Sequence, residues 1–231
     1  MNESSKTQNV RPPTFAASYL QGRLIDIGAG DDLVCPWAEG FDVGDGDANV
    51  ISRFRVVKAY DAVHSSHCLE HMNSPQSALL EWWALVKPGG FLVVVVPEES
   101  LYEQRHWPSL FNGDHKWTFR IGGLGSWSPR SIDVSELFQA LPGGEVLSVE
   151  LQDMNYDRSL LDDGTRKAPP VTISRILILL AHFGPMGLAL QKSLFRLLHS
   201  MGYAVDQTLG SALAQIQVVA KKHCVEARKQ A

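Results

Sequence analysis

Apolar runs separated by glycine, proline and acidic residues predict strands in the first half of the chain. Residues 23–27 read RLIDI and lead into GAGDD, the pattern of a buried strand that ends in a glycine turn. YDAVHSS at 60–66 predicts a second buried strand. FLVVVVP at 91–97 has six consecutive apolar residues before a proline, as a central parallel strand covered on both faces would have.

The segment between the last two of these strands has the period of a helix. Leu79, Trp82, Trp83 and Val86 recur at i, i+3, i+4 and i+7, and the sequence KPGG at 87–90 ends the pattern. Strand, helix and strand in this order form a βαβ unit. The chain is therefore predicted to have an α/β fold with a Rossmann-like, doubly wound sheet.

The second half predicts one short helix, two strands and an insertion. SIDVSELFQAL is a short helix with a cap at Ser131 or Asp133, and EVLSVELQDM and AQIQVVAKK alternate as strands do. Between these strands, residues 153–209 form an insertion that we expect to be mainly helical. Residues 1–20 are predicted to be an N-terminal tail without an early helix, because of Pro12 and Pro13. Residues 21–231 are predicted to be a single domain.

Composition narrows the class of protein. The 231 residues are 45% hydrophobic and 20% charged, which is enough for one good-sized core. A net charge of −4 provides no basic field for nucleic acid. Three cysteines without a C-x-x-C pair, and a polar N-terminus, favour a cytoplasmic protein. The apolar segment 176–190 is too short and too interrupted to be a transmembrane helix.

The glycine turn after the first strand predicts a ligand site. Gly28 and Gly30 lack side chains where a ligand would approach the end of the strand, although a tight turn alone also explains them. Asp26, Asp31 and Asp32 would repel a pyrophosphate, and the third glycine of the dinucleotide fingerprint is missing. The turn therefore favours a positively charged ligand, such as a sulfonium derived from methionine.

Four segments in order resemble the motifs of class I S-adenosylmethionine-dependent methyltransferases. These segments are LIDIGAGDD, FDVGDGDA, YDAVHSSHCLEHM and EWWALVKPGGFLVVVVP, within residues 22–98, and they are most similar to a bacterial subgroup with an SSHxLEH signature. The resemblance implies a seven-stranded sheet whose last strand, here QIQVVAKK, is antiparallel. It also implies S-adenosylmethionine as cofactor and S-adenosylhomocysteine as product.

The resemblance assigns the cofactor-binding residues to the ends of the first strands. By this resemblance, residues of the glycine turn line the methionine end, acids after the second strand hold the ribose and the adenine, and the signature adds two further contacts. The residues are Asp26, Gly28, Ala29 and Gly30 for methionine, Asp42 for ribose, Asp47 and Ala48 for adenine, and Ser65 and His67 in the signature.

The chain departs from the family pattern between the first and third motifs. The 30 residues between Gly30 and Asp61 are too few for a helix, a strand, a helix and a further strand of ordinary length. One element is therefore shortened, and Asp42, Asp45 and Asp47 compete for two roles. A turn-rich loop without a binding role is the alternative interpretation of DVGDGDAN.

The segment HCLEHM has the H-x-x-E-H spacing of some metalloproteases. His67 and His71 are four residues apart, with Glu70 between them. No third, distant ligand is evident in the sequence, so we predict no metal site and expect Glu70 and His71 to cap and orient the following helix. A divalent metal ion is the alternative.

The loop after the third buried strand is predicted to hold the methyl acceptor. His106, Asp114 and His115 lie there among aromatic residues. His115 with Asp114 beside it is the predicted base for a hydroxyl acceptor, and His106 is the second candidate. A packed surface loop is the alternative interpretation of each histidine.

These residues predict an O-methyltransferase for a small molecule or a sugar unit. An N-methyltransferase and a non-catalytic methyltransferase-fold subunit are the alternatives. Residues 171–201 of the insertion are interpreted as a lid, a homodimer contact or a peripheral membrane contact, the last because Arg175, Lys192 and Arg196 accompany its apolar residues.

Overall fold

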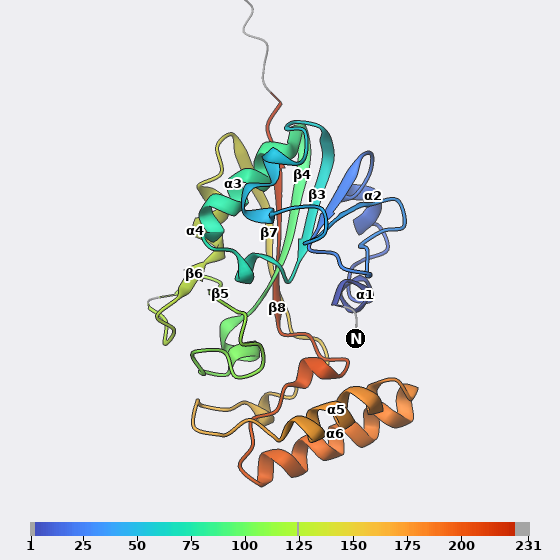
Figure 1. The fold of residues 1–231 in the computed structure, drawn as a ribbon, viewed down its shortest axis with the longest axis vertical. Helices are drawn as coiled ribbons and strands as arrows, with labels where there is room; N and C mark the ends of the chain where they lie inside the picture. The colour runs from blue at the N-terminus through green and yellow to red at the C-terminus, as the bar shows by residue number, and fades with distance from the viewer. Residues whose placement is uncertain (1–2, 124, 225–231) are drawn as a thin grey trace, which may run out of the picture.

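The computed structural model describes residues 3–123 and 125–224. These residues fold around a central sheet of six strands (Figure 1). The strand order is β2-β1-β3-β4-β8-β7. The strands are β1 (Leu24–Ile27), β2 (Glu39–Phe41), β3 (Tyr60–Ser66), β4 (Val86–Pro97), β7 (Gly144–Gln152) and β8 (Gln215–Lys222). Two short strands, β5 (Thr118–Arg120) and β6 (Ser131–Asp133), pair separately. The Rossmann-like α/β prediction is confirmed.

The strand directions confirm one expectation and correct another. The first four strands are parallel, and β8 runs antiparallel to both β4 and β7, as expected for the last strand. In the described residues the sheet has six strands rather than the expected seven. The 18 residues between β2 and β3 contain the 3-10 helix η1 (Ala48–Arg53) and leave no room for another strand with its connections.

The carboxyl ends of the first three strands meet at one edge of the sheet. Ile27 pairs with Phe41 of β2 and with Ser65 of β3, so these strands end at the same level. In open α/β sheets, ligands bind in the loops that leave this edge. The register therefore brings the glycine turn, the acidic loop after β2 and the SSH segment together.

Helices cover both faces of the sheet. α3 (Pro75–Leu85) and α4 (Val134–Gln139) lie on one face, and α2 (Phe15–Tyr19) covers the other (Figure 1). Trp82 of α3 is fully buried and donates its indole N–H to the carbonyl oxygen of Ala48 at 2.9 Å. This bond ties the core to η1, at the edge where the strands end.

Of the two predicted caps, Asp133 and not Ser131 caps the helix α4. The Asp133 carboxylate accepts hydrogen bonds from the first turn of α4, whereas the Ser131 hydroxyl donates to Glu99.

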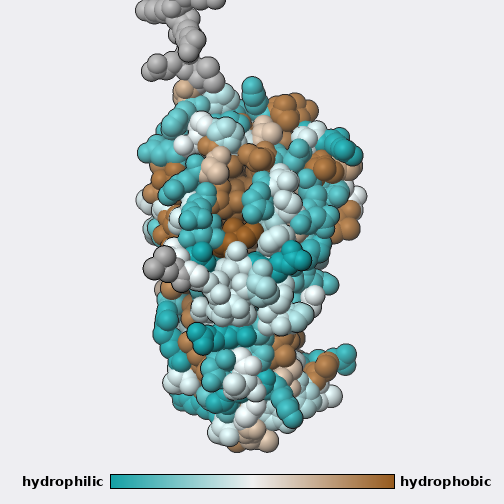
Figure 2. All heavy atoms as spheres, turned by 90° about the vertical axis from the view of Figure 1, so that its left-hand side faces the viewer, coloured by the Kyte–Doolittle hydropathy of each residue, from teal (hydrophilic) through white to brown (hydrophobic). Residues whose placement is uncertain are grey.

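Figure 2 shows the side of the molecule on which α3 and α4 lie in Figure 1. Polar side chains cover much of it, with apolar atoms exposed between them in its upper half.

The N-terminal residues are not the tail expected from the sequence. α1 (Glu3–Gln8) and α2 flank Pro12 and Pro13, and the segment is bonded to the sheet. Arg11 is buried, with its Nε donating to Gln217 Oε1 at 2.7 Å and one terminal nitrogen 3.2 Å from His64 Nε2. These partners lie far away in the sequence, so local patterns could not reveal them.

The insertion lies between β7 and β8, at the end of the sheet where the parallel strands finish (Figure 1). It contains α5 (Val171–Ala181) and α6 (Gly184–Ser200), with the 3-10 helices η4 (Arg158–Leu160) and η5 (Gln207–Leu209). Its own apolar cluster includes Leu177, Phe195 and Leu198. Among the described helices, none has the length and the apolar character needed to cross a bilayer.

We expect Trp82→Ala to lower the free energy of unfolding by about 3–5 kcal/mol, the usual cost of removing a large buried aromatic side chain. Leu80→Ala on the same helix is the control, because Leu80 is 48% exposed, and its effect should be below about 1 kcal/mol. Urea unfolding measures both. Equal effects of the two substitutions would contradict the core described above.

Candidate functional site

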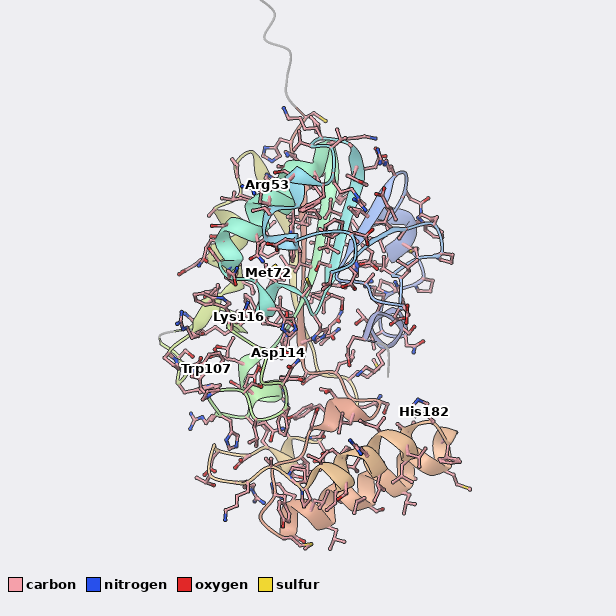
Figure 3. All side chains as sticks on the ribbon, in the orientation of Figure 1. Arg53, Met72, Trp107, Asp114, Lys116 and His182 are labelled. Carbon is pink, nitrogen blue, oxygen red and sulfur yellow. The ribbon has the colours of Figure 1, made fainter. Side chains whose placement is uncertain are left out.

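A cavity of about 520 Å³ opens where β1, β2 and β3 end. Apolar and acidic residues line it together. The lining residues are Gly28, Phe41, Asp42, Val43, Gly46, Asp47, Ala48, His67, Cys68, His71 and Met72. Figure 3 shows Met72, with Asp114 and Lys116 below it, beside the lower end of the sheet.

A second cavity, of about 370 Å³, adjoins the first. The two share Gly28, Asp42 and His67, so they form one elongated cleft. The second is lined by the glycine turn and by the N-terminal helix α1. Its other residues are Glu3, Ser4, Ala29, Gly30, Asp31, Asp32 and Ser66. Ser5 of α1 donates its backbone N–H and its hydroxyl to the Asp32 carboxylate, which fixes α1 over this end of the cleft.

The glycine turn is shaped by a close approach of Cys68. Gly28 has φ +75°, and a Cβ placed there would lie 2.7 Å from both Cβ and Sγ of Cys68. Gly30 also has a positive φ, but a Cβ there would meet only Asp42 Oδ2, at 3.9 Å. Burial raises the pKa of Cys68 to about 12, so the neutral thiol acts as an apolar part of the wall.

The acidic loop after β2 resolves which carboxylates face the cleft. Asp42 lines both cavities and accepts a hydrogen bond from Gly30 N at 2.7 Å. Asp47 and Ala48 line the larger cavity, and hydrogen bonds from Asn49 lower the pKa of Asp47. Asp45 lines neither cavity and accepts from the Asp42 backbone N–H instead.

Two predicted cofactor residues lie away from the cleft. Asp26 is buried, with Oδ1 2.6 Å from His64 Nδ1 and Oδ2 accepting from Val34 N at 2.7 Å. Burial lowers the pKa of His64, so the neutral ring donates from Nδ1 to Asp26. Ser65 donates its hydroxyl to the Ile27 carbonyl. Both side chains join β1 to β3 rather than facing a ligand.

Ser66, and not the predicted Ser65, is the serine that lines the cleft. Ser66 lines the smaller cavity, and its buried hydroxyl oxygen has no hydrogen-bond partner among the described residues. Side chains of successive strand residues point to opposite faces, so the two serines of the signature cannot share one role. Locating the end of β3 was needed to choose between them.

Three histidines surround the buried carboxylate of Glu70. Glu70 lies in the 3-10 helix η2 (Leu69–His71), and its Oε1 is 3.6 Å from His67 Nδ1 and 3.9 Å from Nε2 of both His71 and His115. Burial opposes the negative charge, but the histidines outweigh it and lower the pKa of Glu70. Burial likewise opposes the charge on His67, whose acidic neighbours still raise its pKa to about 9.

This cluster does not cap the helix that follows it, contrary to the expectation for Glu70 and His71. α3 begins after Ser74, whose hydroxyl oxygen accepts from Ser77 N at 3.3 Å. The acidic and imidazole groups of η2 are therefore not used by the helix end. They lie instead at the wall of the cleft, where His67 and His71 line the larger cavity.

The predicted acceptor-site residues are placed differently from the expectation. The carboxylate that orients His115 is Glu103, with 2.6 Å between Oε1 and Nδ1, and not the exposed Asp114. His106 Nε2 lies 2.6 Å from Asp162 Oδ2, in the insertion. Neither His106 nor His115 lines the two cavities. Glu103 had no sequence signal, because eleven residues of irregular loop lie between it and His115.

A comparison with models of protein families shows to which family this chain belongs. The model described as a methyltransferase domain matches residues 6–130, more than half of the sequence. The chain belongs to this methyltransferase family. The matched residues include the first four strands, the acidic loop and the Glu70 cluster. Among curated proteins, the methyltransferase has no significant match.

Solved structures with a similar course of the chain include an S-adenosylmethionine-dependent methyltransferase from Archaeoglobus fulgidus. It is 14% identical, with 96% of this chain and 95% of that chain covered and a TM-score of 0.48. The YcgJ protein from Bacillus subtilis is also 14% identical, with coverage of 89% and 93% and a TM-score of 0.46. At these values the family model remains the basis of the assignment.

The cofactor of this methyltransferase family is S-adenosylmethionine, and the cleft fits it. Phe41, Val43 and Met72 offer an apolar wall for a planar base in the larger cavity. Asp42 provides a carboxylate at the point where the two cavities join. The smaller cavity offers the unpartnered Ser66 hydroxyl and an acidic surface, which suit the positively charged methionine end.

We expect Gly28→Val to abolish detectable binding of S-adenosylhomocysteine, because the new side chain would clash with Cys68 and enter the cleft. Gly122→Val is the matched control, since Gly122 has φ +58° but a Cβ placed there would meet nothing within 4 Å. Calorimetric titration measures affinity, and thermal melting shows whether each variant folds. Unchanged affinity in folded Gly28→Val would place the cofactor elsewhere.

Proposed function

We propose that this protein is a cytoplasmic O-methyltransferase that methylates a hydroxyl group of a small molecule or a sugar unit. The observation that carries the proposal is the group of histidines around Glu70 at the wall of the cleft. A hydroxyl acceptor must lose a proton during methyl transfer, and these groups provide acid–base chemistry at that place. Three free cysteines agree with a reducing compartment.

Within this proposal the cleft holds the cofactor from the glycine turn to η1. Gly28, Ala29 and Gly30 would lie along the methionine part, Asp42 would accept hydrogen bonds from the ribose, and Asp47 with Ala48 would contact the adenine. Their positions along the two adjoining cavities support this order. The cofactor supplies a methyl group on a positively charged sulfur.

The chain's own contribution is to align the acceptor and receive its proton. Alignment follows from a cleft that is closed by α1 at one end, with His67 where the two cavities join and His71 in the larger cavity. His115, the base expected from the sequence, faces Glu70 rather than the cavity. In this proposal it acts through the cluster, and His67 and His71 are the members that meet the acceptor.

An N-methyltransferase and a non-catalytic subunit remain the two competing functions. The test is release of S-adenosylhomocysteine by the full chain with panels of hydroxyl and amine acceptors. Turnover confined to hydroxyl acceptors supports the proposal, and turnover confined to amines rejects it in favour of N-methylation. Cofactor binding without turnover, together with a stable complex in a pull-down, supports the non-catalytic subunit.

We expect Asp42→Ala to weaken binding of S-adenosylhomocysteine roughly 10- to 150-fold, from the loss of a charge-assisted hydrogen bond worth about 1.5–3 kcal/mol. Asp45→Ala is the matched control in the same loop, and its effect should be less than about threefold because Asp45 lines neither cavity. Calorimetric titration gives both affinities. A larger loss in Asp45→Ala would show that the ribose is held by the other carboxylate.

A further inference from the structure

Three hydrogen-bond acceptors converge beside the cleft. One ligand atom each from Glu70, His71 and His115 lies within 4.8 Å of the others. His71 Nδ1 is 3.1 Å from the Asp114 carbonyl oxygen, and His115 Nδ1 is 2.6 Å from Glu103 Oε1. Oxygen atoms of these types only accept, so each Nδ1 carries the proton. When the two rings are neutral, their Nε2 lone pairs therefore face the Glu70 carboxylate.

The Glu70 carboxylate has histidines within ion-pair distance but, in the described part of the chain, no hydrogen bond. Its side chain is completely buried, and neither carboxylate oxygen has a hydrogen-bond partner among the described residues. A buried carboxylate that makes no hydrogen bond is unfavourable even beside an ion-pair partner. His67 Nδ1 is 3.6 Å away, and the other nitrogen of that ring is 3.0 Å from Gln215 Oε1. This contact does not involve the Nε2 atoms of His71 and His115, which stay available to bind a metal ion.

We propose that Glu70, His71 and His115 bind a divalent transition-metal ion. Two ligand atoms that are each about 2.1 Å from one ion lie up to about 4.2 Å apart, and each Nε2 is 3.9 Å from Glu70 Oε1. Glu103 and the Asp114 carbonyl then orient the two rings, as the hydrogen-bond partners of histidine ligands do in metal sites. Two imidazoles with one carboxylate favour zinc, manganese or iron over magnesium or calcium.

The proposed site has an open side toward the cleft, because His71 lines the larger cavity. Three protein ligands leave a coordination position for another molecule. An acceptor hydroxyl in that position would have a lowered pKa and would lose its proton more readily. This use of the site rests on the proposed function, whereas metal binding does not.

Cobalt(II) is the probe, because its visible absorption reports coordination directly. The full chain is treated with a chelator, dialysed and titrated with Co²⁺, and we expect saturation near one equivalent and displacement by Zn²⁺. His71→Ala and His115→Ala should weaken Co²⁺ binding by about tenfold or more. His182→Ala is the control, since His182 is exposed at the far end of the insertion helices (Figure 3), and should bind as the native chain does.

The outcomes separate the metal site from the cofactor site. The proposal would be overturned if the native chain showed no Co²⁺ absorption, or if His115→Ala showed the same absorption as the native chain. Protonated His67 would then be the cation beside Glu70. Glu103→Gln, which keeps Glu70 and both ligand rings, should weaken Co²⁺ binding less than His115→Ala. Titration with S-adenosylhomocysteine shows whether each variant is folded. Its failure in the native chain would reject the proposed function without deciding the metal site.

A second inference concerns the outer surface of α5 and α6. Four residues of the α6 region recur at i, i+4, i+11 and i+15 and so share one helix face. They are Met186, Leu190, Leu197 and Met201, each more than half exposed. Ile176, Leu179 and Phe183 repeat at i, i+3 and i+7 along α5 and are exposed to a similar degree. The described residues leave both apolar stripes uncovered.

The charge of this segment indicates the kind of surface that would cover it. Residues 164–205 contain no aspartate or glutamate, although the whole chain has a net charge of −4. The same range carries five cations: Arg166, Lys167, Arg175, Lys192 and Arg196. Arg166 and Arg196 lie within ion-pair distance of Asp162 and Asp157, whereas the other three cations form no ion pair among the described residues. Exposed apolar stripes accompanied by unpaired cations suit the interface of a membrane with anionic lipids. We infer that the α5–α6 pair binds the surface of such a membrane.

Co-sedimentation of the full chain with lipid vesicles tests this inference. Binding to vesicles of phosphatidylcholine with phosphatidylglycerol should exceed binding to phosphatidylcholine alone and should fall with added salt. Leu190→Glu should reduce it several-fold, and Leu80→Glu on α3 should not. Equal binding to both vesicle types would overturn the inference. So would a dimer, seen by light scattering, that Leu190→Glu dissociates, because a second copy would then cover this face.

Discussion

The contact between Gly28 and Cys68 determines how the first and third strands of the sheet end. A side chain at Gly28 would overlap Cys68, so β1 and β3 can finish at this separation only with glycine in the turn. Because β3 leads directly into η2, the same contact holds His67 beside the glycine turn, with Glu70 behind it at 3.6 Å. The Gly28–Cys68 contact therefore positions both the cleft and the histidine cluster.

The opposite face of the sheet uses polar groups for a structural purpose. Asp26, His64 and Arg11 form a buried chain from β1 across β3 to the N-terminal segment. Charges in such a place are tolerated only when each has partners. The chain fixes the N-terminal segment, and α1 in turn borders the smaller cavity through Glu3 and Ser4. Asp26, which the sequence predicted to contact the cofactor, thus stabilises the cleft indirectly, through the N-terminal segment.

The short connection between β2 and β3 concentrates the acidic residues. With η1 in place of a strand, Asp42 and Asp47 follow β2 within one compact loop, and Trp82 holds the end of that loop through Ala48. The core helix α3 consequently stabilises the floor of the larger cavity. The insertion contributes at a distance, since Asp162 binds His106 of the loop that carries His115.

The sequence by itself determined the strands at 24–27 and 60–66, residues 91–97 of β4, most of α3 and the family, because periodicity and ordered motifs are local properties. It did not show that α3 ends at Leu85 and that β4 already begins at Val86, so that residues 87–90 belong to the strand. The tertiary structure decided which polar residues meet. His115 pairs with Glu103 rather than its neighbour Asp114, and Arg11 finds Gln217 at the other end of the chain. Such contacts depend on how elements pack in space, and no spacing along the chain encodes them.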